Sequence, residues 1–117
     1  MTSILLADDH QVVREALRFL LESQPEFKVL AETGDGIETL SAAEKLRPDV
    51  LIVDMMMPGL SGLEVSRRVL HLSPSTKVIV LSMHDSESYV AEALAAGAAG
   101  YVLKRSEERR VGKECRL

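Results

Sequence analysis

Hydrophobic residues along the chain follow two alternating spacings, which predict a regular order of strands and helices. Short apolar runs, typical of strands buried on both faces, occupy residues 3–7, 27–33, 49–55, 76–83 and 100–104. Between these runs, apolar residues recur at helical spacing and predict helices over residues 12–23, 37–46, 63–72 and 86–97. Pro25, Pro48 and Gly97 fit this division, because each closes or follows a predicted helix.

This strand–helix alternation predicts the fold class. Buried strands joined through helices by right-handed crossovers form a doubly wound α/β fold, here a five-stranded parallel sheet with helices on both faces. The chain has 117 residues, which is enough for one domain with its own core. In such sheets, ligands bind in the crevice beyond the carboxyl ends of the strands.

Polar residues close four of the five predicted strands. Asp8 and Asp9 follow the first strand, and Asp54 closes the third. Ser82 closes the fourth strand and Lys104 the fifth. Because the carboxyl ends of parallel strands meet at one edge, we expect three carboxylates, a hydroxyl and an ammonium in a single crevice.

Three carboxylates in a small space repel one another, and the protein can relieve this repulsion by protonating one of them or by binding a hard cation. Oxygen ligands without cysteine or histidine favour Mg2+, which would also hold a phosphoryl group. Lys104 and the Ser82 hydroxyl could then contact phosphoryl oxygens.

Each of these residues also has a simpler interpretation. Two acids after a strand are commonly a turn or a helix cap, and a single lysine or serine at a strand end is commonly structural. We expect His10 and His84 to be surface residues rather than ligands. The side chains of "MMM" (55–57) are expected in loop and packing roles, although Met56 could offer its backbone carbonyl.

Composition narrows the class of protein. No apolar run approaches the roughly 18–20 residues that span a membrane, and the start "MTSILLADD" lacks the pattern of a secretory signal, so we expect a cytoplasmic protein. The single cysteine, Cys115, excludes an intrachain disulfide and a cysteine-based zinc site. The net charge of −4 argues against direct binding of nucleic acid by this chain.

Four motifs together resemble the receiver domain of bacterial two-component response regulators. They are "LLADDH", "DVLIVDMMMPGLSGLEV", "VIVLSMH" and "AGAAGYVLK". The resemblance covers residues 1–104 and is nearest in style to regulators of the NarL/FixJ type. It implies a flavodoxin-like fold and a signalling switch with intrinsic autophosphorylation and autodephosphorylation chemistry, rather than an enzyme.

The resemblance also implies how the acidic residues act. Asp54 would accept a phosphoryl group from a sensor histidine kinase. Mg2+ would be held by Asp9 directly, by Asp8 through water, and by Asp54 and the carbonyl of Met56.

Three further residues would respond to phosphorylation. Ser82 would move toward the phosphoryl group, Lys104 would pair with it, and Tyr101 would change rotamer. We expect the face of the fourth helix and fifth strand to be the output or dimer surface, controlling a transcriptional output domain absent from this chain.

Three other functions remain as alternatives. An aspartate-nucleophile phosphohydrolase usually has a second acid two residues after its nucleophile on the first strand, where this chain has His10. A nucleotide-binding module needs a glycine-rich loop, which "ADDHQVV" lacks. A pseudo-receiver that acts only by protein contact would not need the complete set of acids, hydroxyl and lysine.

The last 13 residues depart from this pattern. Residues 105–117, "RSEERRVGKECRL", carry a charge of +2 and no apolar stripe, whereas the family places a fifth helix there, followed by a DNA-binding domain. "RSEERRVGKEC" resembles the translation of a common short-read sequencing adapter; the alternative is a divergent, solvated helix. We expect the fifth helix to be missing or replaced, and the exposed flank to lower stability, to leave a makeshift tail or to be covered in a homodimer.

Overall fold

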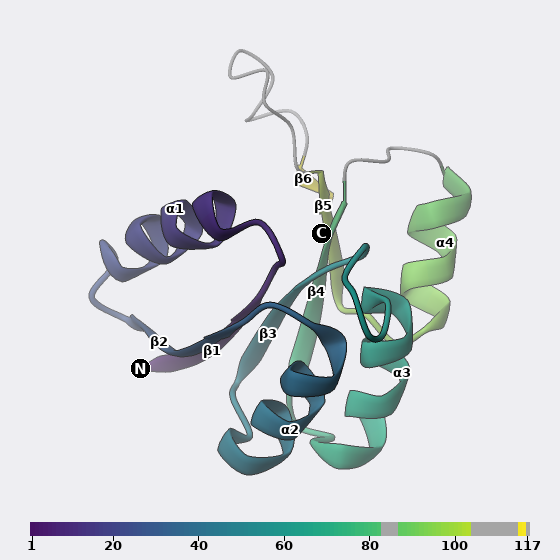
Figure 1. Cartoon of the computed structure of the whole chain (residues 1–117), viewed down its shortest axis with the longest axis horizontal. Coiled ribbons are helices and arrows are strands. Elements are labelled where there is room, and N and C mark those ends of the chain that lie inside the picture. Colours follow the sequence, from purple (N-terminus) through teal and green to yellow (C-terminus); the bar gives the residue numbers. More distant parts are fainter. Residues whose placement is uncertain (83–86, 104–114, 117) are drawn as a thin grey trace.

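The computed structural model describes residues 1–82, 87–103 and 115–116, and these form one sheet with helices on both faces (Figure 1). The strands are β1 Thr2–Ala7, β2 Phe27–Thr33, β3 Val50–Asp54, β4 Lys77–Ser82, β5 Gly100–Leu103 and β6 Cys115–Arg116. The helices are α1 Gln11–Glu22, α2 Gly36–Leu46, α3 Gly62–Leu72 and α4 Glu87–Ala95. The elements predicted from the hydrophobic pattern are therefore confirmed, and their ends shift by only one or two residues.

The strand order is β2-β1-β3-β4-β5-β6. The first five strands pair in parallel, as predicted, and their order is that of flavodoxin-like sheets. The short strand β6 pairs antiparallel with β5, with Val102 opposite Cys115. The apolar pattern did not predict β6, because two residues are too few to carry a period.

Two of the helices begin with a side-chain cap. Asp35 accepts a hydrogen bond from the backbone N–H of Glu38 at the start of α2, at 2.8 Å. Ser61 does the same for Glu64 at the start of α3, at 3.2 Å. Each cap satisfies a backbone donor that has no partner within its own helix, and this fixes where the helix begins.

Side chains on β1 and β3 alternate between two apolar clusters. Leu5 and Leu51 face the larger cluster, to which α2, α3 and α4 contribute Ala43, Val65, Val69 and Ala93. Ile4 and Leu6 face a smaller cluster, against which Leu17 and Leu21 of α1 pack. Figure 1 shows α1 on one side of the sheet and α2, α3 and α4 on the other.

No helix in the described part of the chain is long and apolar enough to cross a membrane.

Candidate functional site

The candidate site lies where β1 and β3 end side by side at the carboxyl edge of the sheet. Ala7 is paired with Val53, so Asp8 follows one strand while Asp54 closes its neighbour. Both aspartates are buried, with 1% and 3% of their surface exposed. This is the meeting of acidic residues that the sequence predicted.

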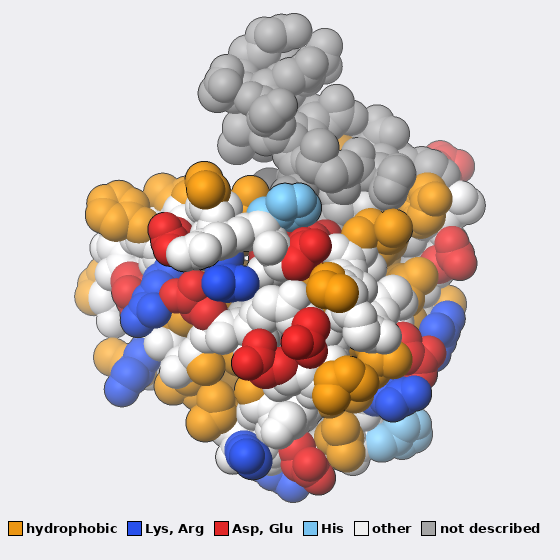
Figure 2. Space-filling view, viewed as in Figure 1, with side chains coloured by type: hydrophobic (Ala, Val, Ile, Leu, Met, Phe, Trp, Pro, Cys, Tyr) orange, Lys and Arg blue, Asp and Glu red, His pale blue; other side chains and the backbone are white. Residues whose placement is uncertain are grey.

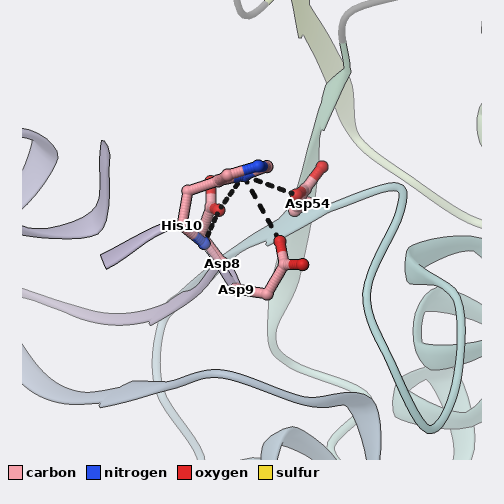
Figure 3. A group of neighbouring side chains, drawn as sticks. All are labelled: Asp8, Asp9, His10 and Asp54. Carbon is pink, nitrogen blue, oxygen red and sulfur yellow. Dashed lines mark hydrogen bonds and ion pairs between the residues drawn. The ribbon is translucent and has the colours of Figure 1, made fainter. Parts of the chain in front are cut away.

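Asp9 and His10 complete a cluster with these two residues (Figure 3). One ligand atom from each of Asp8, Asp9, His10 and Asp54 lies within 4.8 Å of the others. The imidazole Nδ1 of His10 is 3.2 Å from Asp8 Oδ1, 3.3 Å from Asp9 Oδ1 and 3.9 Å from Asp54 Oδ2. His10 is exposed, as expected of a surface residue, with 61% of its side chain accessible. Its ring nevertheless lies beside three carboxylates, a proximity that the sequence did not reveal.

Backbone contacts fix the acidic loop after β1. The N–H of Asp8 donates to the carbonyl of Thr33 at 3.0 Å, which joins the loop to the end of β2. The N–H of His10 donates to Asp8 Oδ1 at 2.8 Å and closes a tight turn. This backbone contact to an aspartate two residues earlier is an Asx turn, and it leaves His10 Nδ1 3.2 Å from the same carboxylate oxygen.

Arg14 of α1 ties this loop to the sheet, a role that the sequence did not reveal. Its Nη1 donates to the carbonyl of Asp8 at 2.7 Å, and its Nε donates to Glu32 Oε1 at 3.0 Å. Arg18 donates to the other oxygen of Glu32 at 2.6 Å. The hydrogen bond from Arg18, helped by that from Arg14, holds the pKa of the Glu32 carboxyl below its usual value.

The backbone around Asp54 is equally constrained. The N–H of Met56 donates to Asp54 Oδ1 at 3.3 Å, and the N–H of Gly62 donates to the carbonyl of Met55 at 2.8 Å. A Cβ on Gly62 would collide with the carbonyl oxygen of Asp54. Only glycine therefore allows the start of α3 to pack this closely beneath the acidic residue.

Ser82 lies at the same edge of the sheet. It is the last residue of β4, and its neighbour Leu81 is paired with Asp54. The Ser82 hydroxyl is buried and donates to Met55 Sδ at 3.7 Å. Lys104 and His84 lie outside the described residues.

Met56 and Tyr101 occupy opposite environments. Met56 is 63% exposed, and its backbone N–H donates to Asp54. Tyr101 is paired with Val80 and buried within the larger core cluster, with 1% of its surface exposed. Its ring therefore forms part of the core in this conformation, and its predicted change of rotamer stays a prediction, as does the ligand role of the Met56 carbonyl.

The residues of the cluster fit a hard divalent cation. Buried carboxylates repel each other strongly where water screens them little, and a cation between them removes that cost. Mg2+ typically takes one or two carboxylates and keeps several waters, and the exposed side of Asp9 leaves room for water. Asp8, Asp9 and Asp54 would provide the carboxylates.

A family model described as the response regulator receiver domain matches residues 4–116. The chain is 43% identical over 104 residues to the transcriptional regulatory protein DegU of Brevibacillus brevis, covering 89% of this chain and 44% of DegU. It is 42% identical over 106 residues to the oxygen regulatory protein NreC of Staphylococcus epidermidis, covering 90% of this chain and 49% of NreC. The chain thus spans about half the length of these relatives.

Solved structures of response regulators also match the fold of this chain. A LuxR-family two-component response regulator from Aurantimonas sp. SI85-9A1 has a TM-score of 0.86 and 32% identity, covering 97% of this chain and 81% of that one. The isolated REC domain of RcsB from Salmonella enterica serovar Typhimurium, solved with phosphomimetic BeF3−, has a TM-score of 0.84 and 29% identity. That match covers 96% of this chain and 83% of the RcsB domain.

Proposed function

Because this chain belongs to the response regulator receiver domain family, we propose that it is a phosphorylation-dependent switch whose phosphoacceptor is Asp54. One observation carries the assignment: Asp54 closes β3 within 4.8 Å of two further carboxylates, at the edge of the sheet where this fold binds ligands. Receiver domains of this family are signalling proteins rather than classical enzymes.

The proposed reaction transfers a phosphoryl group from a phosphohistidine of a sensor histidine kinase to Asp54. A carboxylate oxygen of Asp54 attacks phosphorus, a P–O bond forms, and the P–N bond breaks with its electron pair going to the departing imidazole nitrogen. Transfers of this kind depend mainly on positioning and charge neutralisation. When bound, Mg2+ would supply that neutralisation, held by Asp9, Asp54 and the carbonyl of Met56, with Asp8 acting through water.

The proposed response follows from the new charge. The phosphoryl group on Asp54 would draw the Ser82 hydroxyl and the Lys104 ammonium toward it, and Tyr101 would change rotamer on the β5 side of the sheet. The surface formed by α4 and β5 would then change, and this surface would bind an output region or a second copy of the chain. The relatives are about twice as long as their matched part and include a transcriptional regulator, which supports a transcriptional output in the longer protein.

We further propose that residues 1–104 are the receiver domain and that residues 105–117 are foreign to it. The support is the resemblance of "RSEERRVGKEC" to a translated sequencing adapter. The alignments with DegU and NreC extend over 104 and 106 residues, whereas the family model runs to residue 116. Sequencing the source DNA tests this proposal, and codons that differ from the adapter over this stretch would overturn it.

Intact-mass analysis after treatment with acetyl phosphate and Mg2+ tests the phosphoacceptor. We expect the protein to gain the mass of one phosphoryl group, and Asp54→Asn to abolish the gain. Asp49→Asn is the matched control, because Asp49 is an exposed carboxylate near the opposite edge of the sheet, where it accepts hydrogen bonds from Ser3. Phosphorylation of Asp54→Asn at the normal level would refute the assignment.

A further inference from the structure

His10 faces the metal cradle proposed above, and its position suggests a role in choosing the metal. A single N–H can point at only one acceptor, yet Nδ1 lies within 3.9 Å of carboxylate oxygens on three residues. The backbone N–H of His10 already donates to Asp8 Oδ1 at 2.8 Å, so that oxygen has a donor without the ring. His10 Nδ1 itself is within hydrogen-bond distance of Asp8 Oδ1, and Figure 3 shows the ring nitrogen joined by dashed lines to all three carboxylates.

The distances around Nδ1 fit shared coordination of one ion. Two ligands that are each about 2.1 Å from an ion lie about 3.0 Å apart at octahedral angles and about 3.4 Å apart at tetrahedral angles. The Nδ1 contacts with Asp8 Oδ1 and Asp9 Oδ1, at 3.2 and 3.3 Å, fall within this interval. The contact with Asp54 Oδ2, at 3.9 Å, requires only a small movement of an exposed ring.

Ligand chemistry then separates two classes of ion. Mg2+ prefers oxygen and binds imidazole poorly, whereas neutral imidazole is a good ligand for nickel, zinc and copper. A cradle of carboxylates alone would distinguish these ions only weakly. Adding an imidazole nitrogen selectively strengthens the binding of the transition ions.

We propose that His10 Nδ1 is a direct ligand for late first-row transition ions, so that the site binds Ni2+ or Zn2+ through nitrogen and carboxylate oxygens and binds Mg2+ through oxygens alone. His10 is then a residue that determines metal specificity. The consequence is competition, because a transition ion held by His10 occupies the carboxylates that Mg2+ needs. This inference rests on the proposed function, since it uses the same cradle.

Calorimetric titration of the full chain with Ni2+ and separately with Mg2+, at one fixed pH, tests the role of His10. We expect His10→Ala to weaken Ni2+ binding about tenfold or more and to leave Mg2+ binding within about twofold. His71→Ala is the matched control, because it removes an exposed imidazole from the last turn of α3. His10→Gln repeats the test with a polar side chain at the start of α1, and circular dichroism checks the fold of each variant.

Nuclear magnetic resonance provides a second measurement. Paramagnetic Ni2+ at low stoichiometry should broaden the ring signals of His10 and leave those of His71 sharp. Equal losses of Ni2+ and Mg2+ affinity in His10→Ala, or an equal loss of Ni2+ affinity in His71→Ala, would overturn the proposal. Phosphorylation assays with Mg2+ keep the two proposals distinguishable. If the metal test fails but His10→Ala is still phosphorylated at Asp54, only the metal proposal is refuted. If Asp54→Asn is phosphorylated as well, the proposed function is refuted whatever the metal test shows.

Discussion

The two faces of the sheet differ greatly in how their helices are held. Beneath α2, α3 and α4 lies a large cluster of buried residues, including Leu51, Val53 and Tyr101. Beneath α1 the buried part of the cluster is Ile4, Leu6 and Val29, and α1 itself has no buried residue. The α1 face therefore depends much less on apolar burial than the opposite face does.

The exposed side of α1 carries several large apolar side chains among its polar ones. Val12, Phe19 and Leu20 are 79%, 76% and 62% exposed, and Figure 2 shows hydrophobic side chains over this end of the molecule. Polar contacts compensate on the inner side, where Arg14 and Arg18 share Glu32 of β2. The two sides of the site are therefore held differently. Asp54 closes β3, which packs in the larger cluster, whereas the loop with Asp8 and Asp9 leads into α1 and is tied to it by Arg14.

The largest effect should come from the larger apolar cluster beneath α2, α3 and α4. Leu51→Ala deletes a completely buried side chain from the larger cluster and should lower the free energy of unfolding by about 2–5 kcal/mol. The matched variant is Leu17→Ala, which shortens a half-buried side chain of α1 and should cost about 1 kcal/mol. Urea unfolding measures both values, and equal losses would contradict the difference between the two faces.

A smaller effect should come from the charged contacts of α1. Glu32→Gln should lower the free energy of unfolding at neutral pH, because the folded-state pKa of Glu32 lies below its usual 4.5 and the ionised form is the one that the arginines stabilise. That contribution is complete above the unfolded-state pKa and is lost as the pH falls through the folded-state pKa. The difference between the two proteins should therefore shrink on acidification.

Urea unfolding at several pH values measures this difference, with Glu22→Gln as the control. Glu22 contacts only Arg18 among the ion pairs of the described residues, at 3.3 Å, and is more exposed than Glu32. It should therefore contribute less. If the stability difference between the parent chain and Glu32→Gln grew as the pH fell, the ionised Glu32 carboxylate would not be the stabilising form.

The smallest effect should come from the outer side of α1. Phe19→Ser removes a ring that is 76% exposed, so the free energy of unfolding should change by no more than about 0.5 kcal/mol. Light scattering at rising concentration should show less association than in the parent chain, because the apolar surface is smaller. A loss as large as that of Leu51→Ala would mean that the ring is buried in solution.

The sequence alone determined the order of the elements and the meeting of Asp8, Asp9 and Asp54. Both follow from short-range rules: apolar periodicity separates strands from helices, and parallel strands bring their carboxyl ends to one edge. The same rules placed Ser82 at that edge. These rules can bring together residues that are far apart in the chain, because the order and direction of the strands can be predicted without side-chain contacts.

Only the tertiary structure decided how the site is assembled. The turn that directs His10 to three carboxylates depends on a hydrogen bond to Asp8, and the tie from Arg14 to Glu32 joins residues on different elements. The difference in apolar burial between the two faces of the sheet also appears only in the tertiary structure. Periodicity identifies which side chains are apolar, but not how much of the chain packs over them. Side-chain direction and cover depend on contacts between distant segments, and those contacts exist only once the sheet has formed.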